Sequence, residues 1–165
     1  MRKILFCIAV LFVIILAGSS FKHNETSSEL KIGSKMPVFK LNDNSLILGN
    51  DKSKYTLVTF WMSSDAESRM ACAQYDRMIS SDRKLSEKIC FEGVNFDISK
   101  SLFEEIIACD NLNSSTQVYA DLPNRKEMIK VYGLEKGFGS VLVSPKGEII
   151  EFNPSKEDLI KLIVN

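Results

Sequence analysis

The cysteine thiols are the most versatile reactive side chains in this 165-residue sequence, and their spacing limits the kinds of site that they can form. Cys72, Cys90 and Cys109 stand 18 and 19 residues apart, whereas zinc sites use close pairs of cysteines or histidines. The single histidine, His23, precedes the predicted folded part, so it supplies no base to a nucleophile there. The spacing therefore predicts no metal site and no cofactor, and it leaves thiol chemistry as the candidate.

These three thiols allow several arrangements. The fourth cysteine, Cys7, lies in the N-terminal apolar run, and the odd number that remains without it permits, in an oxidising compartment, one disulfide and one thiol, or no disulfide at all. Cys72 falls at a core-facing position of a predicted helix, so we expect it to be buried and inert. Cys90 opens a predicted strand and Cys109 closes the helix that follows, which places both at the same end of the sheet. A Cys90–Cys109 disulfide is therefore one of the open alternatives.

The N-terminus carries the pattern of an export signal. Arg2 and Lys3 precede an apolar run, residues 4–17, that ends in small residues. As a helix this run of 14 residues extends about 21 Å, less than the roughly 30 Å hydrocarbon core of a bilayer. We expect residues 1–20 to be a signal peptide, or alternatively an uncleaved signal anchor, and residues 21–35 to be a polar tether. The predicted location is the periplasm or the cell envelope.

Composition predicts one globular domain over residues 36–165. Hydrophobic residues make up 45% and charged residues 25% of the chain, which supplies a core and excludes a disordered chain. Lys plus Arg equals Asp plus Glu at 21 each, so no strong field favours a nucleic-acid partner. Glu104 and Glu105 are neighbours on a predicted helix and face apart, so a solvated surface is a better interpretation than a paired-carboxylate site.

Alternating strands and helices predict the order of elements in this domain. The β-branched and aromatic residues 55–61 predict a buried central strand, and Ser63 or Ser64 then caps a helix over residues 65–79. Residues 80–82 are most simply a surface turn. The other expected elements are a hairpin of residues 37–41 and 45–48, strands at 89–96, 117–119, 140–143 and 148–151, helices at 100–109 and 124–132, and a last helix with a Ser155–Asp158 capping box. This order predicts an α/β fold with a parallel core and crossover helices.

Five segments of the domain carry a family resemblance. They are Leu57-Val-Thr-Phe-Trp-Met-Ser63, Arg69, Gly93-Val-Asn-Phe-Asp97, Val131-Tyr-Gly-Leu134 and Leu142-Val-Ser-Pro-Lys-Gly147. In order and spacing, over about residues 35–163, they resemble the thioredoxin superfamily and within it the exported TlpA-like redoxins. The resemblance implies a thioredoxin-like three-layer fold. Its central mixed sheet would carry an N-terminal hairpin, crossover helices, a C-terminal hairpin and a final helix.

The resemblance also implies a place for the chemistry. In that family the strand ending in Phe-Trp leads into a Cys-x-x-Cys motif at a helix N-terminus, which stabilises the attacking thiolate. The matching positions here are Asp65, Ala66, Glu67 and Ser68, and neither a carboxylate nor a serine hydroxyl can exchange disulfides. We expect Asp65 and Ser68 to cap the helix, with a role in ligand binding as the alternative.

A second family feature, the cis-proline that shapes the substrate groove, matches Phe138. Because a cis bond before a residue other than proline costs roughly 2.5–4 kcal/mol, we expect the Gly137–Phe138 bond to be trans. The Phe138 ring then either packs into the core or is presented at a binding surface. In the family this loop lies beside the start of the redox helix, so residues 64–68 and 137–140 should meet.

These features together predict an exported thioredoxin-like protein that lacks the redox dithiol and binds an envelope protein or peptide. No residue is predicted to be catalytic under this interpretation. The predicted binding residues are Ser64, Asp65, Ser68, Phe138 and Gly139, with Trp61 packed beneath them. The alternative is a thiol-disulfide oxidoreductase or peroxidase-like redoxin that uses Cys72, Cys90 or Cys109.

Overall fold

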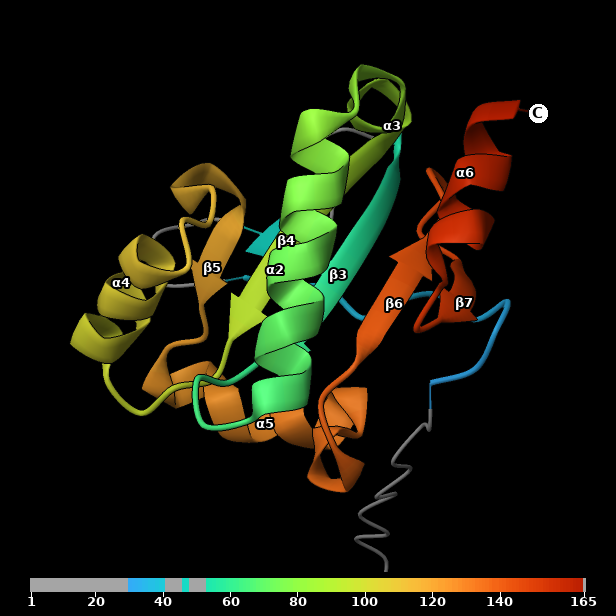
Figure 1. Cartoon of the computed structure of the whole chain (residues 1–165). Helices are drawn as coiled ribbons and strands as arrows, with labels where there is room; N and C mark the ends of the chain where they lie inside the picture. The colour runs from blue at the N-terminus through green and yellow to red at the C-terminus, as the bar shows by residue number, and fades with distance from the viewer. Residues whose placement is uncertain (1–29, 41–45, 48–52, 165) are drawn as a thin grey trace, which may run out of the picture.

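A five-stranded mixed sheet forms the centre of the computed structural model, which describes residues 30–40, 46–47 and 53–164. The strands lie in the order β5-β4-β3-β6-β7 (Figure 1). Their bounds are Tyr55–Trp61 for β3, Ile89–Asn95 for β4, Gln117–Tyr119 for β5, Ser140–Val143 for β6 and Ile149–Phe152 for β7. Because β3 pairs in parallel with β4 and antiparallel with β6, the sheet is mixed, as predicted.

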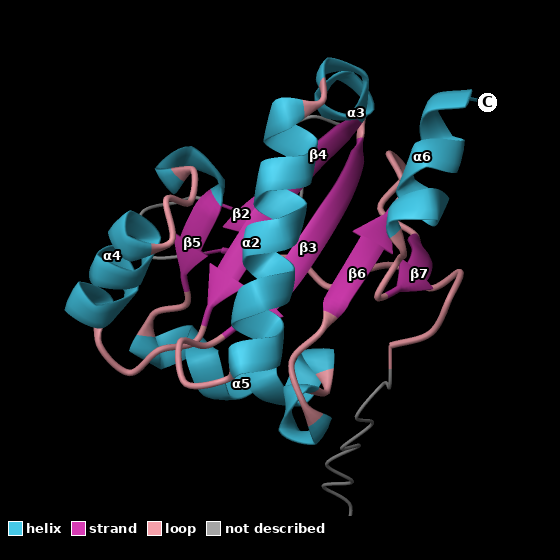
Figure 2. Ribbon diagram, viewed as in Figure 1, coloured by secondary structure: helices cyan, strands magenta, loops and turns pink. Residues whose placement is uncertain are grey.

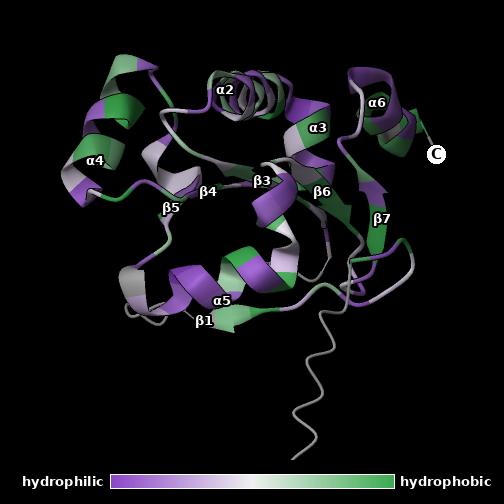
Figure 3. Ribbon diagram, turned by 90° about the horizontal axis from the view of Figure 1, so that it is seen from below, coloured by the Kyte–Doolittle hydropathy of each residue, from purple (hydrophilic) through white to green (hydrophobic). Residues whose placement is uncertain are grey.

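Helices cover both faces of this sheet and complete three layers (Figure 2). The helices are α2 (Ala66–Ser81), α3 (Arg83–Lys88), α4 (Lys100–Cys109), α5 (Leu122–Tyr132) and α6 (Lys156–Val164), with 3-10 turns η1 (Ser114–Thr116) and η2 (Leu134–Lys136). Figure 3 shows α2, α3, α4 and α6 on one face and α5 on the other. The hairpin of β1 (Phe39–Lys40) and β2 (Leu46–Ile47) lies on the α5 side.

Alternate residues of β3 supply two cores, one on each face of the sheet. Leu57 and Trp61 belong to the cluster beneath α2, α4 and α6, whereas Val58 and Phe60 belong to the cluster beneath α5. All four side chains are at most 1% exposed. The continuous apolar run that predicted a buried strand therefore reflects burial on both faces.

One helix, α3, was not predicted, because residues 80–82 had the composition of a turn. In the structure Asp82 caps this helix, and its Oδ1 accepts hydrogen bonds from the backbone N–H groups of Lys84 at 2.9 Å and Leu85 at 3.3 Å. Leu85 is 1% exposed and packs into the core beneath α2. A six-residue helix with one buried side chain gives too little periodicity for a prediction from sequence.

The predicted capping box at the start of α6 is confirmed. The Asp158 N–H donates to Ser155 Oγ at 3.2 Å, and the Ser155 N–H donates to Asp158 Oδ2 at 3.1 Å. Hydrogen bonds from Lys161 and then from Ser155 lower the pKa of Asp158 to about 2. These bonds fix the turn between β7 and α6.

The folded part begins before the predicted boundary at residue 36. Residues 33–36 run along the outer edge of β7, with the Gly33 N–H donating to Ile149 O at 2.8 Å and the Ile149 N–H donating to Ser34 O at 2.9 Å. They cover part of an otherwise open sheet edge. The predicted signal peptide, residues 1–20, and the first part of the predicted tether lie outside the described residues. Within the described ranges, no helix has the length and apolar composition needed to cross a bilayer.

A buried carboxylate ties α2 to the segment that precedes β5. Asp76 is 3% exposed, and its two carboxylate oxygens accept hydrogen bonds from the Asn113 N–H at 2.9 Å and the Thr116 hydroxyl at 2.8 Å. Burying a carboxylate is unfavourable unless donors surround it. These two bonds therefore hold the edge of the sheet against α2.

We expect Asp76→Ala to lower the free energy of unfolding by roughly 2 kcal/mol, because two donors lose a charged acceptor. Asp76→Asn keeps an oxygen in the same place and should cost less than half as much. Urea denaturation followed by circular dichroism measures both values. Equal losses in the two variants would contradict the assigned role of these hydrogen bonds.

Candidate functional site

The candidate site lies at the edge of the sheet where β3 and β4 end. Trp61, the last residue of β3, is fully buried on the α2 side, with its ring centroid 6.2 Å from that of Phe103. This position confirms the prediction that Trp61 packs beneath the start of α2. The ring gives the turn between β3 and α2 a rigid base.

Asp65, rather than Ser63 or Ser64, caps α2. Its carboxylate accepts a hydrogen bond from the Ser68 N–H at 3.1 Å, and the Ser68 hydroxyl donates to Asp65 O at 3.2 Å. Ser68 is 5% exposed, so its hydroxyl faces the helix start and not solvent. The predicted capping role of Asp65 and Ser68 is therefore confirmed, and both side chains serve the first turn of the helix.

Ser63 is held by a buried carboxylate that sequence reasoning did not single out. Asp97 is 2% exposed, and its Oδ1 accepts hydrogen bonds from the Ser63 N–H at 2.9 Å and the Ser63 hydroxyl at 2.8 Å. Its Oδ2 accepts from the Asn95 amide at 2.9 Å. Polar residues that end adjacent parallel strands were the signal for this network. It fixes the β3–α2 turn to the end of β4.

Arg69, in the first turns of α2, forms a bidentate ion pair with Asp110. Arg69 Nε and Nη2 donate to the two carboxylate oxygens of Asp110, each at 2.7 Å. The hydrogen bonds and the charge of Arg69 lower the pKa of Asp110. Beside this pair lies a hollow of about 370 Å³ that Ser63, Ser64 and Met70 also line. Of the predicted binding residues, Ser64 borders this hollow.

The loop of residues 137–140 reaches the same edge from the other side of β3. Gly137 adopts a φ of 131°, which side-chain-bearing residues rarely adopt, and Gly139 O accepts a hydrogen bond from the Phe60 N–H at 2.9 Å. The Ser140 N–H donates to Asn153 Oδ1 at 2.7 Å. The Gly137–Phe138 bond is trans, as predicted, like every peptide bond in the described residues.

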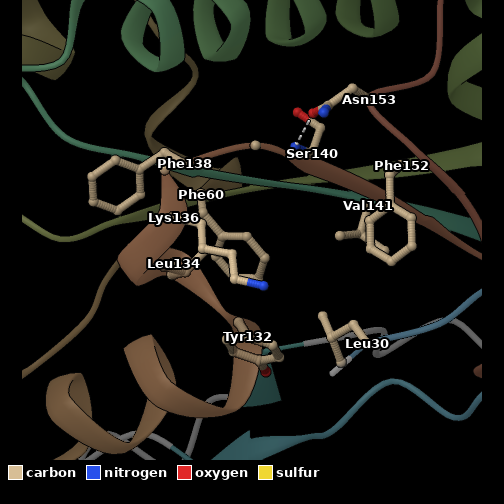
Figure 4. A pocket seen from close by; sticks show the side chains of 12 residues that line it. Leu30, Phe60, Tyr132, Leu134, Lys136, Phe138, Ser140, Val141, Phe152 and Asn153 are labelled. Atoms are coloured by element: carbon tan, nitrogen blue, oxygen red, sulfur yellow. Dashed lines mark hydrogen bonds between the residues drawn. The ribbon is translucent and has the colours of Figure 1, made fainter. Parts of the chain in front are cut away.

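Phe138 occupies an intermediate position between the two predicted alternatives. Its ring is half-buried and lies 5.7 Å from the ring of Phe96, measured between centroids. It also borders a hollow of about 280 Å³ on the α5 side of the sheet (Figure 4). The other walls are mainly apolar and come from Phe60, Tyr132, Leu134, Val141, Phe152 and Leu30, and Lys136 lies at the border.

The predicted binding residues therefore do not share one hollow. Phe138 and Gly139 line the hollow on the α5 side, whereas Ser64 lines the hollow between α2 and α4. Asp65 and Ser68 line neither and cap the helix. The helix start follows β3 and the loop precedes the neighbouring strand β6, so both lie at the same edge, but the two hollows open on opposite faces of the sheet.

Comparison with known proteins gave matches among solved structures only. No family model and no curated protein matches the chain. A thioredoxin-like protein from Parabacteroides distasonis is 29% identical, with a TM-score of 0.71, over 83% of this chain and 97% of that one. The C-terminal domain of a putative thiol-disulfide oxidoreductase from Bacteroides thetaiotaomicron is 28% identical, with a TM-score of 0.67, over 82% and 95% of the two chains.

The chain belongs to the thioredoxin superfamily. A third match, the thioredoxin domain of a thiol-disulfide oxidoreductase from Bacteroides vulgatus, is 24% identical with a TM-score of 0.67 and supports the fold alone. The five segments that carry the resemblance to TlpA-like redoxins fall on β3, α2, β4, the end of α5 and the β6–β7 turn. The predicted three-layer architecture is confirmed.

The thiols of this thioredoxin-like domain lie in different environments. Cys72 is fully buried, and its Sγ donates to Gln117 Oε1 at 3.5 Å. Burial, and then the nearby Asp76 carboxylate, raises the pKa of Cys72 far above that of a free thiol. The sequence prediction of a buried thiol is confirmed, and the raised pKa leaves almost no nucleophilic thiolate.

No disulfide joins Cys90 to Cys109. Cys90 lies at the start of β4, beside Thr56, whereas Cys109 ends α4 next to Asp110, which reaches Arg69 in the first turns of α2. The two cysteines were expected at the same end of the sheet. They are not, because the ten-residue helix α4 is shorter than the seven-residue strand β4 and so returns along only part of that strand. Among the described residues, no group of three or more His, Cys, Asp or Glu side chains is placed to hold a metal ion.

Substitution of Asp65 separates a capping role from a binding role. We expect Asp65→Ala to lower the free energy of unfolding by about 1 kcal/mol, because the Ser68 N–H loses its acceptor, and Asp65→Asn to have a much smaller effect. Thermal unfolding measures both. If Asp65→Ala left stability unchanged, the capping assignment would be wrong.

Proposed function

We propose that this chain is an exported thioredoxin-like protein that binds a protein or peptide of the cell envelope and lacks the superfamily's redox dithiol. The observation that carries the proposal is the hydrogen bond from the Ser68 N–H to the Asp65 carboxylate. At the helix start, where the resemblance places two cysteines, a carboxylate and a hydroxyl close the first turn. Neither group can attack a disulfide or leave from one.

The surroundings of Asp65 and Ser68 support the view that thiol-disulfide exchange has been lost here. They do not favour a transfer of this activity to a neighbouring cysteine. Cys72 is the next thiol along α2, and it is fully buried with a raised pKa. A thiol in this state presents no sulfur to a partner's disulfide. The edge of the sheet keeps its shape through Asp97 and the backbone of Gly139, so it can still contact a partner.

The hollow beside Phe138 is the part of this edge best suited to a partner side chain. It is open, lined by aromatic and aliphatic groups, and its volume of about 280 Å³ accommodates one large apolar side chain (Figure 4). Aromatic anchors in such hollows dominate the energetics of many interfaces. We infer that the partner inserts an apolar side chain here.

The alternative function is thiol-disulfide oxidoreduction by a thiol outside the motif. It is favoured by the similar protein from Bacteroides thetaiotaomicron, whose description is that of a putative thiol-disulfide oxidoreductase. Cys109 is exposed and lies next to the Arg69–Asp110 pair, so it is the thiol that this alternative would use. Exchange through Cys109 would need a second thiol to resolve the mixed disulfide.

Export is part of the proposal, and it rests on residues outside the described ranges. Arg2, Lys3 and the apolar residues 4–17 have the order of a signal peptide. Whether the signal is cleaved decides between a released protein and one anchored by these residues. Mass spectrometry of the N-terminus from the native envelope distinguishes the two.

The purified protein should not catalyse reduction of insulin by dithiothreitol, because Asp65 and Ser68 replace both exchanging thiols. The double variant Asp65→Cys with Ser68→Cys should gain measurable but modest turnover, since Phe138 still stands where the family has its groove proline. Turbidity of precipitated insulin measures the rate. Turnover by the unaltered protein that disappears in Cys72→Ser or Cys109→Ser would instead establish the alternative.

Capture of a partner from the native envelope fraction should weaken in Phe138→Ala, because the hollow loses one aromatic wall. The free energy of unfolding should fall by about 1 kcal/mol, as is usual for a side chain that is only half-buried. The matched control is Ile98→Ala, since Ile98 is an apolar residue with 82% exposure that does not line the hollow. Unchanged capture in Phe138→Ala would place the interface elsewhere, and a loss of several kcal/mol would make Phe138 a core residue.

A further inference from the structure

A second groove lies on the opposite face of the sheet, between α2 and the start of α6. Its volume is about 600 Å³, roughly twice that of the hollow beside Phe138. Ala71, Gln74, Tyr75, Arg77 and Met78 line it from α2, and residues 153–156 line it from the turn before α6. None of the predicted binding residues takes part, and the groove shares only Asn153 with the hollow beside Phe138.

The walls of this groove are held in place by hydrogen bonds. The Tyr75 hydroxyl donates to Pro154 O at 2.7 Å and so joins α2 to the turn before α6. Burial raises the pKa of Tyr75, which keeps the phenol neutral and able to donate. The Ser155–Asp158 capping box fixes the other end of the turn. A ligand therefore meets a groove that is already formed, and little ordering is needed on binding.

The charged side chains that line the groove are all positive. Arg77 and Lys156 are both exposed, and neither side chain forms an ion pair or hydrogen bond with another described residue. No carboxylate is among the lining residues. The nearby Asp158 is already bound by Lys161 at 2.6 Å.

Further carboxylates lie close to this groove. Asp110 lines the neighbouring hollow, which Arg77 also borders, and it is held by Arg69 in a bidentate ion pair. Glu151 lies near Tyr75 and Lys161, and Glu157, which follows Lys156, also lies near Lys161. The rim thus presents two cations that no described carboxylate pairs with.

We propose that this groove binds an acidic segment of a partner protein. Carboxylate side chains of the segment would contact Arg77 and Lys156, and an apolar side chain would pack against Met78 and the Tyr75 ring. The volume and the apolar walls suit several peptide residues better than a single small anion. Charge complementarity of this kind selects the partner and speeds its association.

Methionine methyl groups provide reporters for the test, because they are distributed over the separate surfaces. Met78 lines the proposed groove, Met70 lines the hollow beside Ser64, and Met36 and Met128 are buried on the α5 side. The full chain, labelled with 13C in its methionine methyls, is titrated with the acetylated and amidated peptide Glu-Leu-Glu-Leu-Glu. The Met78 signal should shift, whereas those of Met36 and Met128 should not.

A charge-matched pair of variants tests the two cations. Arg77→Gln combined with Lys156→Gln should weaken binding of the acidic peptide roughly tenfold, the loss expected when two partly exposed ion pairs are removed. Lys84→Gln combined with Lys126→Gln removes the same charge from α3 and α5 and should leave the affinity unchanged. Equal thermal unfolding temperatures in the two double variants show that neither change acts through folding.

Four results would overturn the proposal. They are an unchanged Met78 signal, equal binding of the peptide Lys-Leu-Lys-Leu-Lys, an equal loss of affinity in the control variant, and an equal Met78 shift from sodium glutamate at the same carboxylate concentration. The last result would mean a site for small anions only. A shift of Met70 alone would move the acidic segment to the other groove. Phe138→Ala tests the opposite face, so failure here leaves the proposed function standing, and the reverse also holds.

Discussion

The enclosure of β3 is the constraint on which the rest of this structure depends. Its edges pair with β4 and β6, and its two faces enter separate cores, with Leu57 and Trp61 on one side and Phe60 on the other. Because both faces of β3 are buried, each of its side chains points into the core on its own side of the sheet. The turn that follows Trp61 and the loop that reaches Gly139 are therefore brought to one edge of the sheet, but the hollows they border open on opposite faces.

Polar contacts at this edge stabilise the backbone without thiol chemistry. Asp97 holds Ser63, Asp65 holds the first turn of α2, and Gly139 O accepts the N–H of Phe60. None of these contacts requires a sulfur atom. A helix start that carries Asp65 and Ser68 is thus compatible with a well-ordered edge. This separation of shape from chemistry is what makes a binding role physically reasonable for a thioredoxin-like fold.

Most of the regular elements could be predicted because their patterns are long or strongly apolar. The strand at 55–61, the helix at 100–109 and the strand at 140–143 have the predicted bounds. The helix cap of α2 was predicted wrongly, because neighbouring residues of similar type compete for that role and composition does not distinguish them. Ser63, Ser64 and Asp65 are all good helix caps; in the structure Ser63 donates to Asp97, and Asp65 caps α2.

The sequence by itself determined the fold class, a helix that starts at Asp65 and Ser68, and the burial of Cys72, because each depends on residue type and local periodicity. Only the tertiary structure decided that Cys109 ends near Arg69 rather than near Cys90, and that Arg77 and Lys156 border one groove. These outcomes depend on how far a crossover helix extends along its strand and on how closely α2 and α6 pack. Both distances are set by contacts between residues far apart in the chain, which no local pattern records.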